Sequence, residues 1–205
     1  MARVSQEHLD ARRRQIIDGA IRSFTHNGFH ATSMQDVLRE AGLSAGAVYR
    51  YFRGKEELIA AIVGEVFGTI RGAFEDAAKQ DPPPLPDRLL GQVLNIVLNG
   101  RVGGGSIEFP RLVLQVWAET LRNEQLSAPL QQGFVDMRAA WGKLVDAYRE
   151  AGLMPADVEA DHVARTMMAL AQGFIAQQAL FGDAKVEQLE GGLRALMRME
   201  LPEAG

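Results

Sequence analysis

The chain has 205 residues, of which 47% are hydrophobic and 23% charged, so it can bury a core and is not disordered as a whole. It has no cysteine, which excludes disulfides, thiolate nucleophiles and cysteine metal ligands. No uninterrupted run of about 18 apolar residues occurs, and the N-terminal residues lack the apolar segment of a signal peptide. We therefore expect a soluble, cytoplasmic protein with no membrane partner.

Apolar residues recur with helical spacing along most of the chain, which predicts an all-α fold of about nine helices. A first helix of about 9–26 ends at Gly28, since glycine readily adopts the left-handed conformation that closes many helices. Ser33 followed by Asp36 is a variant of the capping box and starts a second helix of about 34–41. Further helices are expected at 45–52, 55–79, 87–99, 107–124, 127–151, 157–181 and 186–199.

Charge is distributed unequally along the chain. Residues 1–55 hold nine Lys and Arg against five Asp and Glu, a balance of +4. Because the whole chain carries −4, the remaining 150 residues carry −8. A basic end on an acidic body is typical of a protein that presents one face to phosphate groups.

The turn Gly42-Leu43-Ser44 between two short predicted helices indicates a helix-turn-helix. Val48 and Phe52, four residues apart, would brace its second helix from behind and leave the forward face for DNA. The alternative for the two nearby tyrosines is core packing, and for Lys55 a plain helix-terminal position. The open amides at the start of the second predicted helix can also hold phosphate. The candidate DNA-binding residues are Thr32, Ser33, Ser44, Ala45, Gly46, Tyr49, Arg50, Tyr51 and Lys55.

Two runs in this region carry a family signature. Residues 24–37, FTHNGFHATSMQDV, resemble the pattern F-x-x-x-G-[FY]-x-x-T-[ST]-x-x-[DE]-[IV] of tetracycline-repressor (TetR) family regulators. Residues 41–58, AGLSAGAVYRYFRGKEEL, resemble the pattern A-G-[VL]-S-x-G-x-[VIL]-Y-x-[YH]-F-x-x-K-[ED]-x-L of the same family. The match extends over about 50 residues without a gap, whereas the rest of the chain matches only in being helical and of the expected length.

The resemblance implies a helix-turn-helix DNA-binding domain in residues 1–54 and a ligand-binding and dimerisation domain in residues 55–205. It further implies a homodimer that represses from a palindromic operator and is released by a small, largely apolar effector. Tyr49 and Tyr51 would then hold phosphates, as would Lys55 near the start of helix four. Ala45 and Gly46 offer no side-chain hydrogen bond to a base, so direct readout would depend on Arg50, contacts with thymine methyl groups and close backbone approach.

Bodies of this family usually enclose a cavity, and the large apolar residues of this body are candidates to line it. The last two predicted helices combine an apolar stripe, which includes Met167 and Phe174, with many small residues. We interpret these two helices as a four-helix dimer interface, with internal core as the alternative. The candidate ligand-binding residues are Phe67, Phe109, Trp117, Met137, Trp141, Met168 and Gln172.

Other functions have weaker support. The four histidines lack the spacing of a metal site, and no nucleophile motif occurs, so we predict no cofactor, no metal and no catalysis. A helical enzyme is therefore a remote alternative. An activator, or a regulator without a small-molecule effector, is not separated from a repressor by the sequence.

Overall fold

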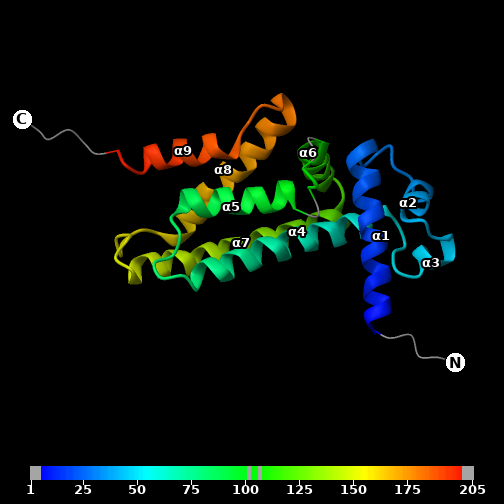
Figure 1. The fold of residues 1–205 in the computed structure, drawn as a ribbon, viewed down its shortest axis with the longest axis horizontal. Coiled ribbons are helices and arrows are strands. Elements are labelled where there is room, and N and C mark those ends of the chain that lie inside the picture. Colours follow the sequence, from blue (N-terminus) through cyan, green and yellow to red (C-terminus); the bar gives the residue numbers. More distant parts are fainter. Residues whose placement is uncertain (1–5, 101–102, 106–107, 200–205) are drawn as a thin grey trace, which may run out of the picture.

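The computed structural model describes residues 6–100, 103–105 and 108–199, and within these ranges every regular element is a helix, as predicted. The three N-terminal helices form a head at one end of an elongated body (Figure 1). The bounds are α1 (Gln6–Asn27), α2 (Met34–Ala41), α3 (Ala45–Tyr49), α4 (Lys55–Ala78), α5 (Pro86–Asn99), α6 (Glu108–Thr120), α7 (Glu124–Glu150), α8 (Ala160–Phe181) and α9 (Val186–Leu196).

Short-range signals set the end of α1 and both ends of α2 close to where the sequence predicted them. Gly28 follows α1 with a φ of 81°, and Gly42 caps α2 with a φ of 66°. The capping box is present: the Ser33 amide donates to Asp36 Oδ2 (3.0 Å), and the Asp36 amide donates to Ser33 Oγ (3.3 Å). Hydrogen bonds from the Ser33 side chain and backbone lower the pKa of Asp36 below its ordinary value.

A close crossing fixes α2 on α1. Gly19 allows it, because a Cβ at this position would lie 2.9 Å from the backbone of Ala41. Beside the crossing, Gln15 Nε2 donates to the Ala41 carbonyl (2.8 Å), and Arg22 Nε pairs with Glu40 Oε1 (2.6 Å). The helix-turn-helix is therefore held by its own packing and polar contacts.

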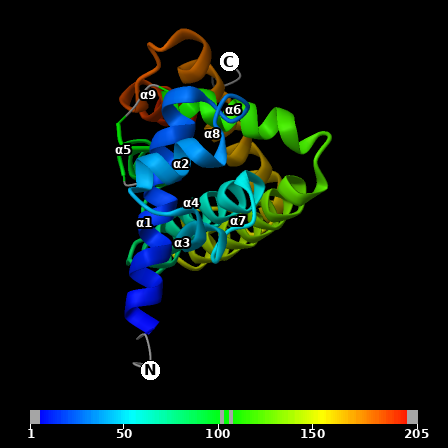
Figure 2. The same cartoon turned by 90° about the vertical axis from the view of Figure 1, so that its right-hand side faces the viewer.

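The two longest helices of the body, α4 and α7, run side by side in the same direction (Figure 1). Phe74 of α4 packs edge-on against Trp141 of α7, with ring centroids 4.9 Å apart. On α5, the buried Asp87 pairs with Arg194 of α9 (Oδ2 to Nε 2.7 Å). The view along the molecule shows the head in front of α4 and α7 (Figure 2).

Several predicted boundaries were wrong by a few residues. α3 ends at Tyr49 instead of residue 52 and continues as a turn. α7 begins at residue 124 instead of 127, because Asn123 caps it by accepting from the Gln125 amide (3.1 Å). α8 begins at Ala160 instead of 157. Part of the predicted connection 101–106 lies outside the described residues.

Candidate functional site

The forward face of α3 and its flanking turns is open to solvent. Ser44, Ala45, Gly46 and Arg50 are exposed, and Tyr49 is 48% exposed. The Ser44 side chain makes no capping bond, so its hydroxyl is free of that role. The rear of the helix is buried by Val48 and Phe52, as predicted. This face has the geometry of a recognition helix, with its rear braced and its front available to a groove.

Thr32 and Ser33 lie where α2 begins, but their side chains have different roles. Ser33 is exposed beside the open amides of α2. The Thr32 side chain is buried, and its hydroxyl donates to the Gly28 carbonyl (2.7 Å), with the Ser23 carbonyl 3.1 Å away. Thr32 therefore contributes to DNA contact at most through its backbone, because its hydroxyl stabilises the turn after α1.

The side chains of Tyr51 and Lys55 are less available for DNA contact than the sequence suggested. Tyr51 is half-buried and packs against the core of the head. Lys55 Nζ donates to the Phe29 carbonyl (3.0 Å) and lies 4.5 Å from the centroid of the Phe29 ring. An ammonium group has three donors, so this anchoring leaves part of its capacity for a phosphate. The sequence gives no sign of this contact, whose partners are 26 residues apart.

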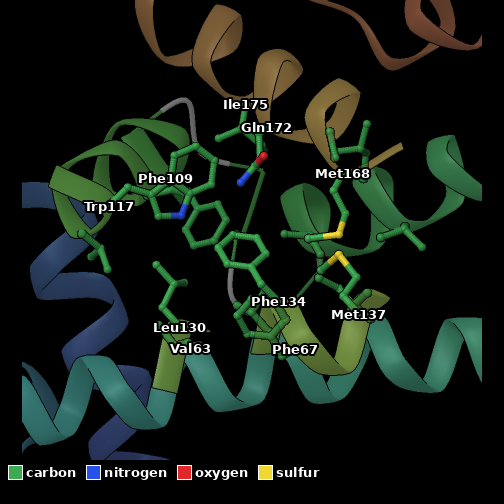
Figure 3. A pocket seen from close by; sticks show the side chains of 18 of the residues that line it. Val63, Phe67, Phe109, Trp117, Leu130, Phe134, Met137, Met168, Gln172 and Ile175 are labelled. Carbon is green, nitrogen blue, oxygen red and sulfur yellow. The ribbon is translucent and has the colours of Figure 1, made fainter. Parts of the chain in front are cut away.

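An apolar cavity of about 150 Å³ lies in the body, between α4, α5, α6, α7 and α8 (Figure 3). Phe67 and Phe134 meet edge-on at its floor, with centroids 5.5 Å apart. No charged side chain is found among the described residues that line it. All seven residues predicted for ligand binding line this cavity: Phe67, Phe109, Trp117, Met137, Trp141, Met168 and Gln172.

Helix α6 touches both the head and the cavity. Its Gln115 Oε1 accepts from the Phe29 amide in the head (2.9 Å), and its Glu119 Oε2 lies 3.3 Å from His30 Nε2. A hydrogen bond from Arg122 lowers the pKa of Glu119 below its ordinary value, so this carboxylate is charged at neutral pH. Other residues of the same helix, including Trp117, line the cavity. The sequence did not predict that α6 connects the head to the cavity, because no local pattern indicates that Gln115 contacts a turn 86 residues away.

The dimer prediction needs correction in its residues. Met167 and Phe174 belong to the core of their own chain, with 4% and 5% exposure, because the apolar stripe of α8 packs on the body. The outward faces of α8 and α9 instead carry small residues interspersed with large apolar ones. These exposed residues include Ala169, Gly173, Leu180, Phe181, Gly192, Ala195 and Leu196.

Neither a metal centre nor a membrane span is found in the part of the chain that the structure describes. Its His, Asp and Glu side chains form no group of three or more that could hold a metal ion. None of its helices is both long and apolar enough to cross a membrane.

Comparison with known proteins agrees with the geometry of the head. Residues 16–62 match the family model for bacterial regulatory proteins of the tetR family. The chain is 42% identical over 65 residues to the HTH-type transcriptional repressor Rv1474c of Mycobacterium tuberculosis, a match that covers 32% of this chain and 35% of the repressor. It is 28% identical over 194 residues to the HTH-type transcriptional regulator TtgR of Pseudomonas putida, covering 90% and 88% of the two chains.

Solved structures share the fold over nearly the whole chain. GusR of Salmonella enterica superposes with a TM-score of 0.74 and 24% identity, covering 97% of this chain and all of that one. FadR of Bacillus subtilis, solved in complex with stearoyl-CoA, gives a TM-score of 0.71 with 15% identity and coverage of 93% and 100%. The family match of the head, the regulators related along the chain and the common fold together identify this protein as a TetR-family transcriptional regulator.

Proposed function

We propose that this regulator is a ligand-responsive repressor, which binds a palindromic operator as a homodimer and is released by a small, largely apolar effector. One observation carries the proposal: α6 contacts the head through Gln115 and Glu119 while Trp117 of the same helix lines the apolar cavity. FadR was solved with stearoyl-CoA, which supports a ligand-binding role for the body of this fold.

DNA binding is proposed for residues 1–54, through the exposed face of α3. Tyr49 and Arg50 are the side chains there with hydrogen-bonding groups and substantial reach. The open amides at the start of α2, beside Ser33, would hold a phosphate by their partial positive charge. Lys55 would contribute with the donor that the carbonyls of Phe29 and His30 leave open.

Dimerisation is proposed through the outward faces of α8 and α9, in the domain of residues 55–205. Small residues such as Ala169 and Gly173 allow two helices to approach closely, and the exposed Leu180 and Phe181 offer apolar area to bury. Two copies related by a two-fold axis would present two α3 helices to successive major grooves, about 34–36 Å apart. A palindromic operator matches this symmetry.

Release follows from the elements that the cavity shares with the head. α4 starts next to α3, and its residues Ile59, Ile62 and Val63 line the cavity together with residues of α6. A ligand that widens the cavity would displace α4 and α6 and change the separation of the two heads. Such coupling is commonly worth about 1–3 kcal/mol, or roughly 5- to 150-fold in operator affinity.

The test is fluorescence anisotropy of a labelled duplex from the gene's own upstream region, titrated with protein at two salt concentrations. We expect saturable binding at two protomers, or a multiple, per site. Tyr49→Ala combined with Arg50→Ala should abolish it, whereas Arg88→Ala, at an exposed arginine of α5, is the matched control and should not. Lys55→Ala alone should reduce the salt slope by about 1, as for one lost phosphate contact.

The same measurements decide against the proposal if the outcome differs. Weak binding that disappears at moderate salt and is unaffected by the substitutions at Tyr49 and Arg50 would mean that the head binds DNA only non-specifically. A reporter fused to the upstream region distinguishes repression from activation: rising expression when the protein is present would make it an activator.

The dimer is tested by analytical ultracentrifugation of Ala169→Glu, with Ala139→Glu at an exposed position of α7 as the control. If Ala169→Glu is still a dimer, the outward face of α8 is not the interface.

A further inference from the structure

The chemistry of the cavity lining limits what it can hold. Among the described residues that line it, Gln172 is the only one whose side chain carries an amide, hydroxyl or charged group. The other polar hydrogens are the indole N–H groups of Trp117 and Trp141, and the remaining side chains are aliphatic, aromatic or methionine. A ligand in this cavity therefore exchanges water for apolar contacts over most of its surface.

A charged ligand would lose its hydration in this cavity without gaining a counter-ion. Transfer of an isolated ion into an apolar interior is strongly unfavourable unless it is paired and hydrogen-bonded. Arg71 and Asp136 line a separate cleft between α4 and α7, and Phe67 and Met137 form part of the wall that both spaces share. The charges of that cleft are thus on the far side of a wall of apolar side chains.

Gln172 is placed to orient a ligand by one or two hydrogen bonds. Its amide projects from α8 into the space between the aromatic side chains and the methionines (Figure 3). A primary amide both donates and accepts, so it can pair with a hydroxyl, carbonyl or ring N–H of a neutral molecule. Since the side chains around it are apolar, such a bond forms without competition from other protein groups.

The size of the cavity indicates a compact ligand. Its volume is about 150 Å³. An engineered protein cavity of about 150 Å³ lined by Leu, Ile and Phe stays dry and binds benzene. Met137 and Met168 are unbranched and adaptable, so the lining can yield to a somewhat larger molecule such as a fused two-ring system.

We propose that the effector is a compact, uncharged aromatic molecule with a single hydrogen-bonding group, and that Gln172 is the residue that recognises this group. The inference rests on the proposed function, because it assigns the ligand class of the same cavity.

Isothermal titration calorimetry with four size-matched probes tests the inference: naphthalene, 1-naphthol, 1-naphthoate and 1-naphthylmethylammonium at pH 8. We expect 1-naphthol to bind most tightly, and both ions to bind at least about a hundredfold more weakly. Gln172→Leu should weaken 1-naphthol by about three- to tenfold and leave naphthalene unchanged or tighter. Gln131→Leu, at an exposed glutamine of α7 that does not line the cavity, is the control and should change neither.

Binding of naphthalene to the Gln172 variant verifies that the variant is folded. The inference is overturned if either ion binds within tenfold of 1-naphthol, if Gln172→Leu weakens naphthalene as much as 1-naphthol, or if no probe binds. Operator anisotropy with each probe separates this result from the proposed function. Release of operator by an ion would refute the neutral ligand and leave a ligand-responsive repressor, whereas 1-naphthol that binds through Gln172 without changing operator affinity would refute the repressor mechanism alone.

Discussion

The buried ion pair between α5 and α9 should respond unequally to loss of its two partners. The Asp87 side chain is 1% exposed and the Arg194 side chain 34%, with Nε and Oδ2 2.7 Å apart. Asp87 Oδ1 has no hydrogen-bond partner among the described residues. Arg194→Met would therefore leave a buried carboxylate without any compensating charge, whereas Asp87→Asn keeps an oxygen acceptor for Arg194, whose side chain is one-third exposed.

The magnitudes follow from this difference in burial. Removal of one partner of a buried pair generally costs about 3–5 kcal/mol, and we expect Arg194→Met in this range. Exchange of a charged hydrogen bond for a neutral one costs about 1–2 kcal/mol, which is our expectation for Asp87→Asn. Asp87→Leu with Arg194→Met should cost less than the Arg194 single variant, because replacement of both charges by apolar groups is often nearly neutral.

Urea unfolding, followed by circular dichroism and tryptophan fluorescence at one protein concentration, gives the free energies of unfolding of the wild type, the two single variants and the double variant. The control is Arg71→Met, which breaks an α4 pair whose side chains are 64% and 63% exposed and should leave the stability unchanged within error. The reasoning is refuted if Asp87→Asn costs as much as Arg194→Met, or if both match the control. In the first case the difference in burial would not set the cost of losing each partner, and in the second case the pair would not hold α9 on the body.

Three further outcomes are expected. Gly19→Ala should lower the free energy of unfolding by about 1–3 kcal/mol, because its Cβ would meet the α2 backbone at 2.9 Å. Gly72→Ala should raise it by up to about 1 kcal/mol in the same urea assay, because no described side chain or neighbouring helix lies within 4 Å of the added Cβ. Burial, and then the charge of Asp87, raise the pKa of Tyr148 above its ordinary 10.0. The stability that this shift contributes is present below pH 10.0 and is lost as the pH rises above it, so Tyr148→Phe should flatten the decline in urea midpoint at alkaline pH.

Much of the head could be predicted from sequence because its signals are local. A glycine after α1, a glycine after α2 and a serine three residues before an aspartate act on their immediate neighbours through backbone geometry and short hydrogen bonds. The spacing of Val48 and Phe52 likewise identified the buried side of the recognition helix. The seven residues chosen for the cavity all line it, since large apolar groups on several amphipathic helices converge on one interior.

The same patterns do not predict whether the apolar face of a helix packs on its own chain or on a partner chain. Met167 and Phe174 form an apolar stripe that suits a partner chain as well as its own core, and only the placement of α8 on the body decided between them. The anchoring of Lys55 on Phe29 likewise depends on how the head packs.

Local sequence patterns were sufficient to predict the all-α fold class, the helix-turn-helix and its exposed recognition face, because these depend on neighbours within a few residues. The packing of the helices was needed to show that α6 contacts both the head and the cavity and that Asp87 pairs with Arg194. It was also needed to show that Gln172 is the one residue, among those described, that brings an amide into that cavity. The physical reason is distance along the chain. Gln115 and Phe29 are 86 residues apart and Asp87 and Arg194 107, so their contacts arise from the crossing of whole helices, which no local pattern encodes.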